Sequence, residues 1–338
     1  MSDFVEAVGA CADGADYRDN GAAAPASQYP SRLLKLSISL GFWCFLAAGR
    51  ILLRLIRRGP SGTATVVYYH QIAPGERQRF ARQLDHLCKW VKPIAADSRY
   101  PLPRGSRCVA VTFDDGWKSF AEIAFPELEQ RKIPVALFAI PGRLGCRLEA
   151  YTDEQLISAA ELEQLAAKGV TIGSHTLTHC PLTIVDDARA LYKLRESRRV
   201  LGELLGQEAT LFAFPFGLSD ERTVALCREA GYRRVFTTQP YRAYSRSGEF
   251  ETGRVRVDPS DWPLEFHLKI IGAYRWLPAA IAAKGRLRQA MHWLMGRTRY
   301  PAEVVPAPSI LEGRGETTLQ AKDQQRDELH ISARKFQV

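Results

Sequence analysis

Residues 108–117 read CVAVTFDDGW, an apolar run that ends in two adjacent acids. The run from Cys108 to Phe113 is rich in β-branched and aromatic residues, which favours a buried strand. Similar short runs alternate with stretches of helical period from Ala64 to Val257, and this alternation predicts an α/β fold with a mainly parallel sheet or barrel and helices outside. In such folds the loops at the carboxyl ends of the strands carry the chemistry. Candidate functional residues are therefore expected directly after the predicted strands.

Asp114 and Asp115 stand where this first strand ends. Two adjacent carboxylates repel each other unless a cation or a proton lies between them, and burying them unpaired is costly. A metal ion would resolve the conflict, because one aspartate would bind it while the other stays free as a proton acceptor. The alternative is that the pair caps the helix that follows.

Two histidines follow another short apolar strand, in the segment GSHTLTH at residues 173–179. His175 and His179 are four residues apart and lie on one face if the loop turns helically, which is the geometry that two imidazoles on one cation require. Two histidines and one aspartate form a metal site with open positions for water and substrate. Histidines satisfied by core or surface contacts are the alternative.

Three further signals are weaker when taken singly. The segment FAFPFG at residues 212–217 predicts a turn after a strand, and such a turn can point a backbone N–H into a pocket. His70 follows the strand predicted over 64–69 and is either a general acid or a structural residue. The segment RVRVD at 254–258, with Asp261 after it, offers cations and a carboxylate that either orient a catalytic aspartate or form surface salt bridges.

Taken together, these segments resemble the polysaccharide deacetylases of carbohydrate esterase family 4. TFDDGW at 112–117 is similar to the family's Asp-Asp motif, SHTLTH at 174–179 to its His-x-x-x-His motif, and FAFPFG at 212–217 to its Pro-aromatic-Gly motif. The similarity covers roughly residues 64–276. It implies a distorted (β/α) barrel of about seven strands, preceded in this chain by an N-terminal hydrophobic and basic helix.

The resemblance also implies roles for individual residues. Asp114 is implied to be the catalytic base, and the backbone N–H of Phe216 is implied to help bind the oxyanion. Zinc or a similar divalent ion is implied to be held by Asp115, His175 and His179.

Two departures from the family pattern change the remaining assignments. Many members carry an arginine two residues before the motif's proline, where it tethers the base, but this chain has Ala213, and the usual Leu-x-His near the end of the domain is missing. A branch similar to poly-N-acetylglucosamine deacetylases reads Phe-Ala-aromatic-Pro here and places its acid histidine in a Tyr-His pair, which Tyr69 and His70 match. This resemblance implies that His70 is the general acid and that Arg254, with Asp261 as its partner, tethers the base.

The implied reaction is the metal-dependent hydrolysis of N-acetyl groups on hexosamine residues of a poly- or oligosaccharide or a glycoconjugate. One alternative is an O-acetyl esterase that acts on a glycan with the same metal site. Another is a catalytically silent saccharide-binding or membrane scaffold protein, which Ala213 and the missing histidine leave open. The expected partner is an acetylated glycan. Nucleic acid is not expected, because the cations form no recognisable reading motif.

The 338 residues allow a full hydrophobic core and one or two domains. Residues 1–31 and 301–338 are expected to be disordered tails, because they are poor in large apolar residues. A catalytic domain is expected over 61–300. The segment 32–60 is expected to be a hydrophobic and basic helix.

That helix contains the uncharged run LSISLGFWCFLAAG at 36–49, with cations on both sides. Its 14 residues are fewer than the ~20 of a membrane-spanning helix, whereas the longer segment 33–53 reaches 21. Membrane association is therefore expected, with spanning and peripheral attachment both open, and a buried soluble helix is the alternative. The net charge of +9 is compatible with anionic lipid.

The expected location is the inner (plasma) membrane. Seven cysteines without a CxxC pair indicate free thiols, and together with the arginines after the apolar run they favour the cytoplasmic side. The family resemblance favours the cell envelope instead.

Overall fold

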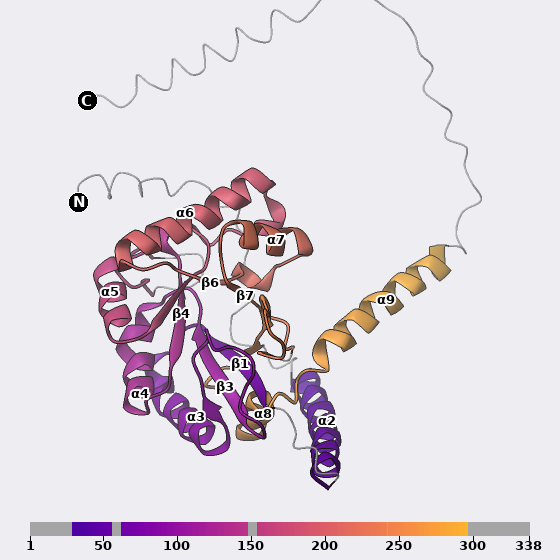
Figure 1. Ribbon diagram of the computed structural model, residues 1–338. Helices are drawn as coiled ribbons and strands as arrows, with labels where there is room; N and C mark the ends of the chain where they lie inside the picture. Colours follow the sequence, from indigo (N-terminus) through magenta and orange to yellow (C-terminus); the bar gives the residue numbers. More distant parts are fainter. Residues whose placement is uncertain (1–28, 56–61, 148–153, 242, 297–338) are drawn as a thin grey trace, which may run out of the picture. The chain divides into compact units, whose positions relative to one another are not determined.

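The computed structural model describes residues 29–55, 62–147, 154–241 and 243–296 (Figure 1). The predicted tails, apart from residues 29–31, lie outside these ranges. The chain divides into two compact units, Met1–Gly285 and Arg286–Val338. In the second unit the structure describes only the end of one helix.

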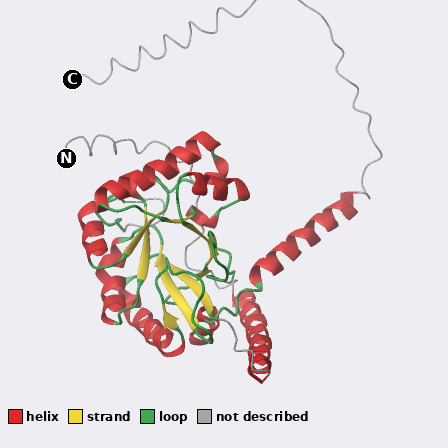
Figure 2. Ribbon diagram, in the orientation of Figure 1, coloured by secondary structure: helices red, strands yellow, loops and turns green. Residues whose placement is uncertain are grey.

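A parallel sheet nearly closed into a barrel forms the centre of the first unit (Figure 2). The strand order is β8-β7-β6-β5-β4-β3-β1-β9, with β2 paired beside β3, and every pair of named strands is parallel. The strands are β1 (Thr63–Tyr69), β2 (Lys92–Pro93), β3 (Arg107–Phe113), β4 (Val135–Ala139), β5 (Thr171–Ser174), β6 (Leu211–Ala213), β7 (Arg234–Thr237), β8 (Glu251–Gly253) and β9 (Val255–Arg256). The predicted distorted (β/α) barrel is confirmed.

The two ends of the strand order are joined through a single residue. β8 pairs with β7 and β9 pairs with β1, yet β8 and β9 follow each other in the chain with only Arg254 between them. The backbone N–H of Arg254 still donates to the Thr237 carbonyl, at 3.0 Å, and that of Val257 donates to Tyr68 on the opposite edge, at 3.1 Å. Arg254 therefore stands where the barrel closes.

Helices cover the outside of the sheet (Figure 1). Between strands the chain forms α3 (Arg77–Trp90), α4 (Phe125–Gln130), α5 (Ala159–Ala167), α6 (Asp187–Leu205) and α7 (Glu221–Glu229), and the other α-helices in the described part of the chain are α2 (Tyr29–Leu55), α8 (Pro263–Ile270) and α9 (Leu277–Gly296). Local sequence explains several of their starts, since Ser158 and Asp220 form capping boxes and Asp186 caps α6.

Alternation along the strands separates two apolar layers. On β1, Val67 and Tyr69 belong to the cluster between sheet and helices, whereas Ala64 and Val66 belong to the cluster inside the barrel. The same alternation on β9 turns Val255 outward. Even-numbered residues of these two strands therefore face the interior, where the functional side chains lie.

The N-terminal helix α2 contains the segment Ser31–Gly49, which is long and apolar enough to cross a membrane by length and composition. The predicted hydrophobic and basic helix is thus present, and its last residues, 56–60, lie outside the described ranges.

Candidate active site

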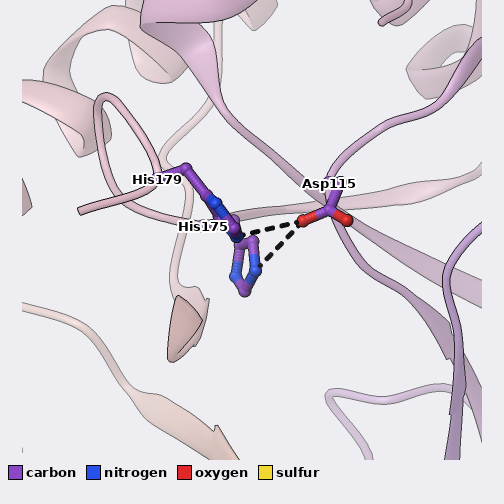
Figure 3. A group of neighbouring side chains, drawn as sticks. All are labelled: Asp115, His175 and His179. Carbon is purple, nitrogen blue, oxygen red and sulfur yellow. Dashed lines mark ion pairs between the residues drawn. The ribbon is translucent and has the colours of Figure 1, made fainter. Parts of the chain in front are cut away.

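Asp115, His175 and His179 form one cluster at the carboxyl ends of β3 and β5 (Figure 3). Asp115 Oδ1 lies 3.4 Å from His175 Nε2 and 3.3 Å from His179 Nε2. Zinc in a tetrahedral site, with bonds of about 2.0–2.1 Å, would place its ligands about 3.4 Å apart. The spacing of this cluster therefore fits a small divalent cation.

The contacts behind these side chains turn one atom of each toward a common point. Trp117 Nε1 donates to Asp115 Oδ2 at 2.9 Å, and His175 Nδ1 lies 2.8 Å from the Ala213 carbonyl oxygen. Asp115 Oδ1 is buried and has no hydrogen-bond partner within the described residues. A buried carboxylate oxygen without a hydrogen bond is costly, and a bound cation would satisfy it.

Backbone strain is concentrated at the same place. Six non-glycine residues in the described ranges have positive φ, and four of them are at this site: Asp115 (71°), Thr176 (64°), His179 (64°) and Phe216 (58°). Such conformations cost of order 1–3 kcal/mol each and persist where the surroundings impose them, typically at functional sites.

The two histidines meet differently from the expectation. Residues 175–179 form a turn with left-handed residues at Thr176 and His179, and not a helical turn. The Leu177 carbonyl accepts a hydrogen bond from the Gly142 N–H at 2.9 Å, and a side chain on Gly142 would collide with that carbonyl. Packing against the loop after β4 therefore holds the histidine turn in place.

Asp114 is held by an arginine from the far edge of the sheet. Arg254 makes a two-pronged contact with it, Nη1 to Oδ1 at 2.7 Å and Nη2 to Oδ2 at 2.8 Å, and Nη1 also reaches Thr112 Oγ1 at 3.2 Å. Both partners are buried, and the guanidinium lies 4.5 Å from the centre of the Tyr68 ring. The carboxylate is thereby fixed in direction, next in the chain to the candidate metal ligand Asp115.

This arrangement also sets the charge of Asp114. Burial alone would raise the pKa of its carboxyl, but the Arg254 and His175 charges and the Arg254 hydrogen bonds outweigh it and lower the pKa. Burial likewise opposes ionisation of Asp115, whose pKa is nonetheless well below its usual value because of His175 and His179. Both aspartates are therefore ionised at neutral pH.

His70 follows β1 directly and is partly buried at the barrel mouth. Its ring packs edge-on against Tyr68, with the ring centres 5.6 Å apart. Burial lowers its pKa most, and the Arg256 charge lowers it further, while Asp115 and Asp114 act in the opposite direction, so that the net pKa lies below the usual 6.5. The negative charges of both aspartates thus act on the pKa of His70.

Phe216 lies in the short helical turn Pro215–Gly217 after β6. Its ring lies 4.5 Å from the His179 ring, centre to centre. Gly217 also has positive φ, and a side chain there would collide with Thr238. The Pro-aromatic-Gly turn is therefore packed against His179, one of the three candidate metal ligands.

Asp261 is not at the site, and its expected pairing with Arg254 is wrong. Its carboxylate binds Lys269 Nζ at 2.7 and 2.8 Å, on the helix α8. Arg254 projects into the barrel interior, because it has the even-numbered parity of the inward-facing residues, and there it meets Asp114 instead. No intermediate partner is needed for the contact between Arg254 and the predicted base.

Sequence reasoning missed two contributors. Trp117 is part of the TFDDGW segment, but only the structure shows its indole N–H on Asp115. The Ala213 carbonyl orients His175, although the side chain at 213 was the feature that stood out in the sequence. The role of Trp117 could have been suspected from its position two residues after Asp115. The role of the Ala213 carbonyl could not, because a backbone contact leaves no signal in the sequence.

Comparisons with known proteins agree with this geometry. Residues 102–235 match the family model described as polysaccharide deacetylase. YxkH of Bacillus subtilis, which is named as a polysaccharide deacetylase, is 25% identical over 205 residues, covering 57% of this chain and 71% of that protein. The poly-β-1,6-N-acetyl-D-glucosamine N-deacetylase of Staphylococcus aureus is 24% identical over 193 residues, covering 52% of this chain and 66% of that enzyme.

A solved structure, IcaB from Ammonifex degensii, superposes with a TM-score of 0.55 at 28% sequence identity. The match covers 64% of this chain and 98% of that one. The fold and the family model thus point to the same group of proteins.

Proposed function

We propose that this protein, whose residues 102–235 match the polysaccharide deacetylase family model, removes N-acetyl groups from hexosamine residues of a saccharide or glycoconjugate by hydrolysing their carbon–nitrogen bonds. One observation carries the proposal. Asp114, a buried carboxylate held at both oxygens by Arg254, is adjacent in the chain to the metal-binding cluster of Asp115, His175 and His179. In the proposed reaction Asp114 is thus a fixed proton acceptor beside the site where a water would be activated.

Asp115, His175 and His179 hold the divalent cation in this scheme, with zinc as the first choice. Bound there, the cation would supply Lewis acidity, which polarises the acetamide carbonyl and lowers the pKa of a water molecule. The remaining steps belong to the protein's own side chains.

Asp114 accepts the proton of the attacking water as the oxygen bonds to the acetyl carbon. Arg254 keeps that carboxylate ionised and aimed, since it occupies both oxygens. The backbone N–H of Phe216 contributes to binding the oxyanion that develops on the carbonyl oxygen. His70 in its imidazolium form then donates a proton to the departing nitrogen and becomes neutral, the carbon–nitrogen bond breaks, and acetate and a free amine result.

The hexosamine specificity is supported by the similarity to the Staphylococcus aureus enzyme, whose name gives poly-β-1,6-N-acetyl-D-glucosamine as its substrate. Support also comes from the position of His70 directly after Tyr69, at the end of β1 and near the predicted base. We therefore propose that an N-acetylglucosamine oligomer or conjugate is bound across the carboxyl ends of the strands.

The experiment is acetate release by the full chain from three substrates: a β-1,6-linked N-acetylglucosamine oligosaccharide, a β-1,4-linked one, and an O-acetylated glycan. We expect equal amounts of acetate and free amine from at least one N-acetylated substrate. Acetate release only from the O-acetylated glycan would overturn the N-deacetylase assignment in favour of an esterase.

Two variants separate chemistry from metal binding. Asp114→Asn should retain the metal but lower kcat by about 10²–10⁴-fold, in the range of general-base losses. His175→Ala should lose both metal, measured by elemental analysis, and activity. A metal-loaded wild type that binds the oligosaccharides without releasing acetate would instead indicate a silent binding protein.

A further inference from the structure

The N-terminal helix α2 has one face that packs on the catalytic domain. The residues of this face are spaced four, three and four apart, as one side of an α-helix requires: Arg32, Leu36, Ser39 and Trp43. Leu36 and Trp43 pack against the apolar cluster between the sheet and the helices. Ser39 is fully buried and accepts a hydrogen bond from Trp276 Nε1 at 2.9 Å. Over these residues α2 is part of the domain and not a free tether.

A charge network fixes the start of the helix. Arg32 Nε donates to Glu265 Oε2 at 2.7 Å, and the same guanidinium lies 4.6 Å from the centre of the Trp262 ring. Lys269 binds Glu265 at 3.2 Å and Asp261 at 2.7 Å, so that two cations and two buried carboxylates balance each other. Separating α2 from α8 would leave the carboxylates without one of their two cations, which is costly for buried groups.

The opposite face of α2 is apolar and bare. Leu34 is 61% exposed and Phe45 is 74% exposed, and other large apolar side chains of the same helix are exposed beside them: Leu33, Ile38 and Leu40. Between residues 31 and 49 the sequence carries only two charges, Arg32 in the network and Lys35. An exposed apolar face of this kind marks an interaction surface.

We propose that α2 lies in the plane of an anionic membrane surface, with its bare face in the boundary between headgroups and acyl chains and its other face on the catalytic domain. Cations along the same segment suit anionic lipid, namely the exposed Lys35 and, further along the sequence, Arg50, Arg54, Arg57 and Arg58. These residues argue for lipid over an apolar protein partner.

The docked face also argues against a spanning helix. A span over Ser31–Gly49 would include the four residues of the docked face named above, which contact the domain. The Glu265, Asp261 and Lys269 charges of the network would then be drawn into the hydrocarbon layer or separated from Arg32, and either change costs several kcal/mol. A helix lying in the interface keeps these contacts intact.

Vesicle flotation of the full chain tests the surface independently of any catalytic activity. We expect binding to phosphatidylcholine vesicles that contain phosphatidylglycerol and weaker binding to phosphatidylcholine alone. Leu34→Gln together with Phe45→Gln should weaken the partition coefficient at least about tenfold, because two large apolar contacts are lost. The matched control is Ile184→Gln with Tyr192→Gln, both 60% exposed on other elements, which should bind as the wild type does.

Topology distinguishes lying from spanning. Epitope tags before Met1 and after Val338 are exposed to protease in spheroplasts and in inverted membrane vesicles. In the proposed arrangement both tags are cut in the same one of the two preparations. Tags cut in opposite preparations would establish a spanning helix and overturn the inference, as would equal flotation of the wild type and the α2 double variant.

Discussion

At the scale of single residues, amide cleavage makes its largest demand on the proton donor, because an amine leaves poorly without a proton. His70 is the side chain proposed for this role, because it directly follows β1 and the charges of Asp114 and Asp115 act on its pKa. We expect His70→Ala to lower kcat on an N-acetylated sugar by about 10²–10⁴-fold. With p-nitrophenyl acetate the loss should be much smaller, because the nitrophenolate leaves without protonation.

The comparison between the two substrates is the measurement for His70. The control is His86→Ala, whose ring contacts His267 on α8 and not the metal cluster, and which should leave both rates near wild type. Equal losses of both rates in His70→Ala would indicate a structural histidine.

Trp117 is the second residue with a distinct expectation. Its indole N–H orients Asp115 through the oxygen that does not face the histidines. Trp117→Phe keeps the ring but removes this hydrogen bond, so metal affinity should fall by about 10–100-fold, as for other groups that orient metal ligands. Competition with a chelator measures the affinity. The matched control is Trp90→Phe, because Trp90 is half-exposed, and this variant should bind the metal as the wild type does. Unchanged affinity in Trp117→Phe would show that the bond plays no part in metal binding.

At the scale of elements, a carboxylate joins α3 to α4. Glu127 accepts hydrogen bonds from Arg77 Nε and Arg131 Nη1, each at 2.7 Å, and these two bonds lower its pKa. A depressed folded pKa contributes stability that is present above the unfolded pKa of about 4.3 and is lost as the pH falls through the folded pKa.

Glu127→Gln should therefore lower the free energy of unfolding by about 1–2 kcal/mol at neutral pH, and the difference from wild type should shrink in acid. Denaturant unfolding at several pH values measures this. Glu229→Gln, which breaks the exposed pair with Arg195, should change stability by less than about 0.5 kcal/mol. A destabilisation by Glu127→Gln that is the same at all pH values would rule out the charge as its cause.

The elements also show how far sequence patterns reach. The runs at 108–113 and 64–69 were predicted as strands because they are short and rich in β-branched and aromatic residues, and both are strands in the structure. β8 was missed because its three residues, Glu251–Gly253, carry no readable period. The spacing of the two histidines would bring them onto one face in a helical turn, whereas the structure brings the two rings together with left-handed residues at Thr176 and His179.

At the scale of the whole molecule, the site depends on contacts that no local pattern contains. Arg254 and Asp114 are 140 residues apart and meet because the chain crosses from β8 to β9 at the point of barrel closure. The sequence showed an arginine, Arg254, in the segment 254–258, but the direction in which its side chain points depends on the strand order. For the same reason Asp261, only seven residues later in the chain, was assigned a partner that it does not contact.

Metal binding should also stabilise the whole barrel. The three candidate ligands come from the ends of β3 and β5, which are separated in the sheet by β4, so that a bound ion would link segments that local structure does not join. A ligand present at one hundred times its Kd stabilises the native state by about 2.7 kcal/mol. Removal of the ion with a chelator should therefore lower Tm by roughly 5–10 °C for a domain of this size.

Thermal unfolding with and without added zinc measures this linkage, and two variants give it a direction. Asp114→Asn should keep the metal-dependent shift in Tm, because Arg254 and not the cation holds its carboxylate. His179→Ala should lose the shift, because it removes one of the three proposed ligands. If zinc stabilised His179→Ala as strongly as the wild type, the ion would be bound elsewhere. A bound cation at this site would then no longer explain why Asp115 Oδ1 is buried without a hydrogen bond.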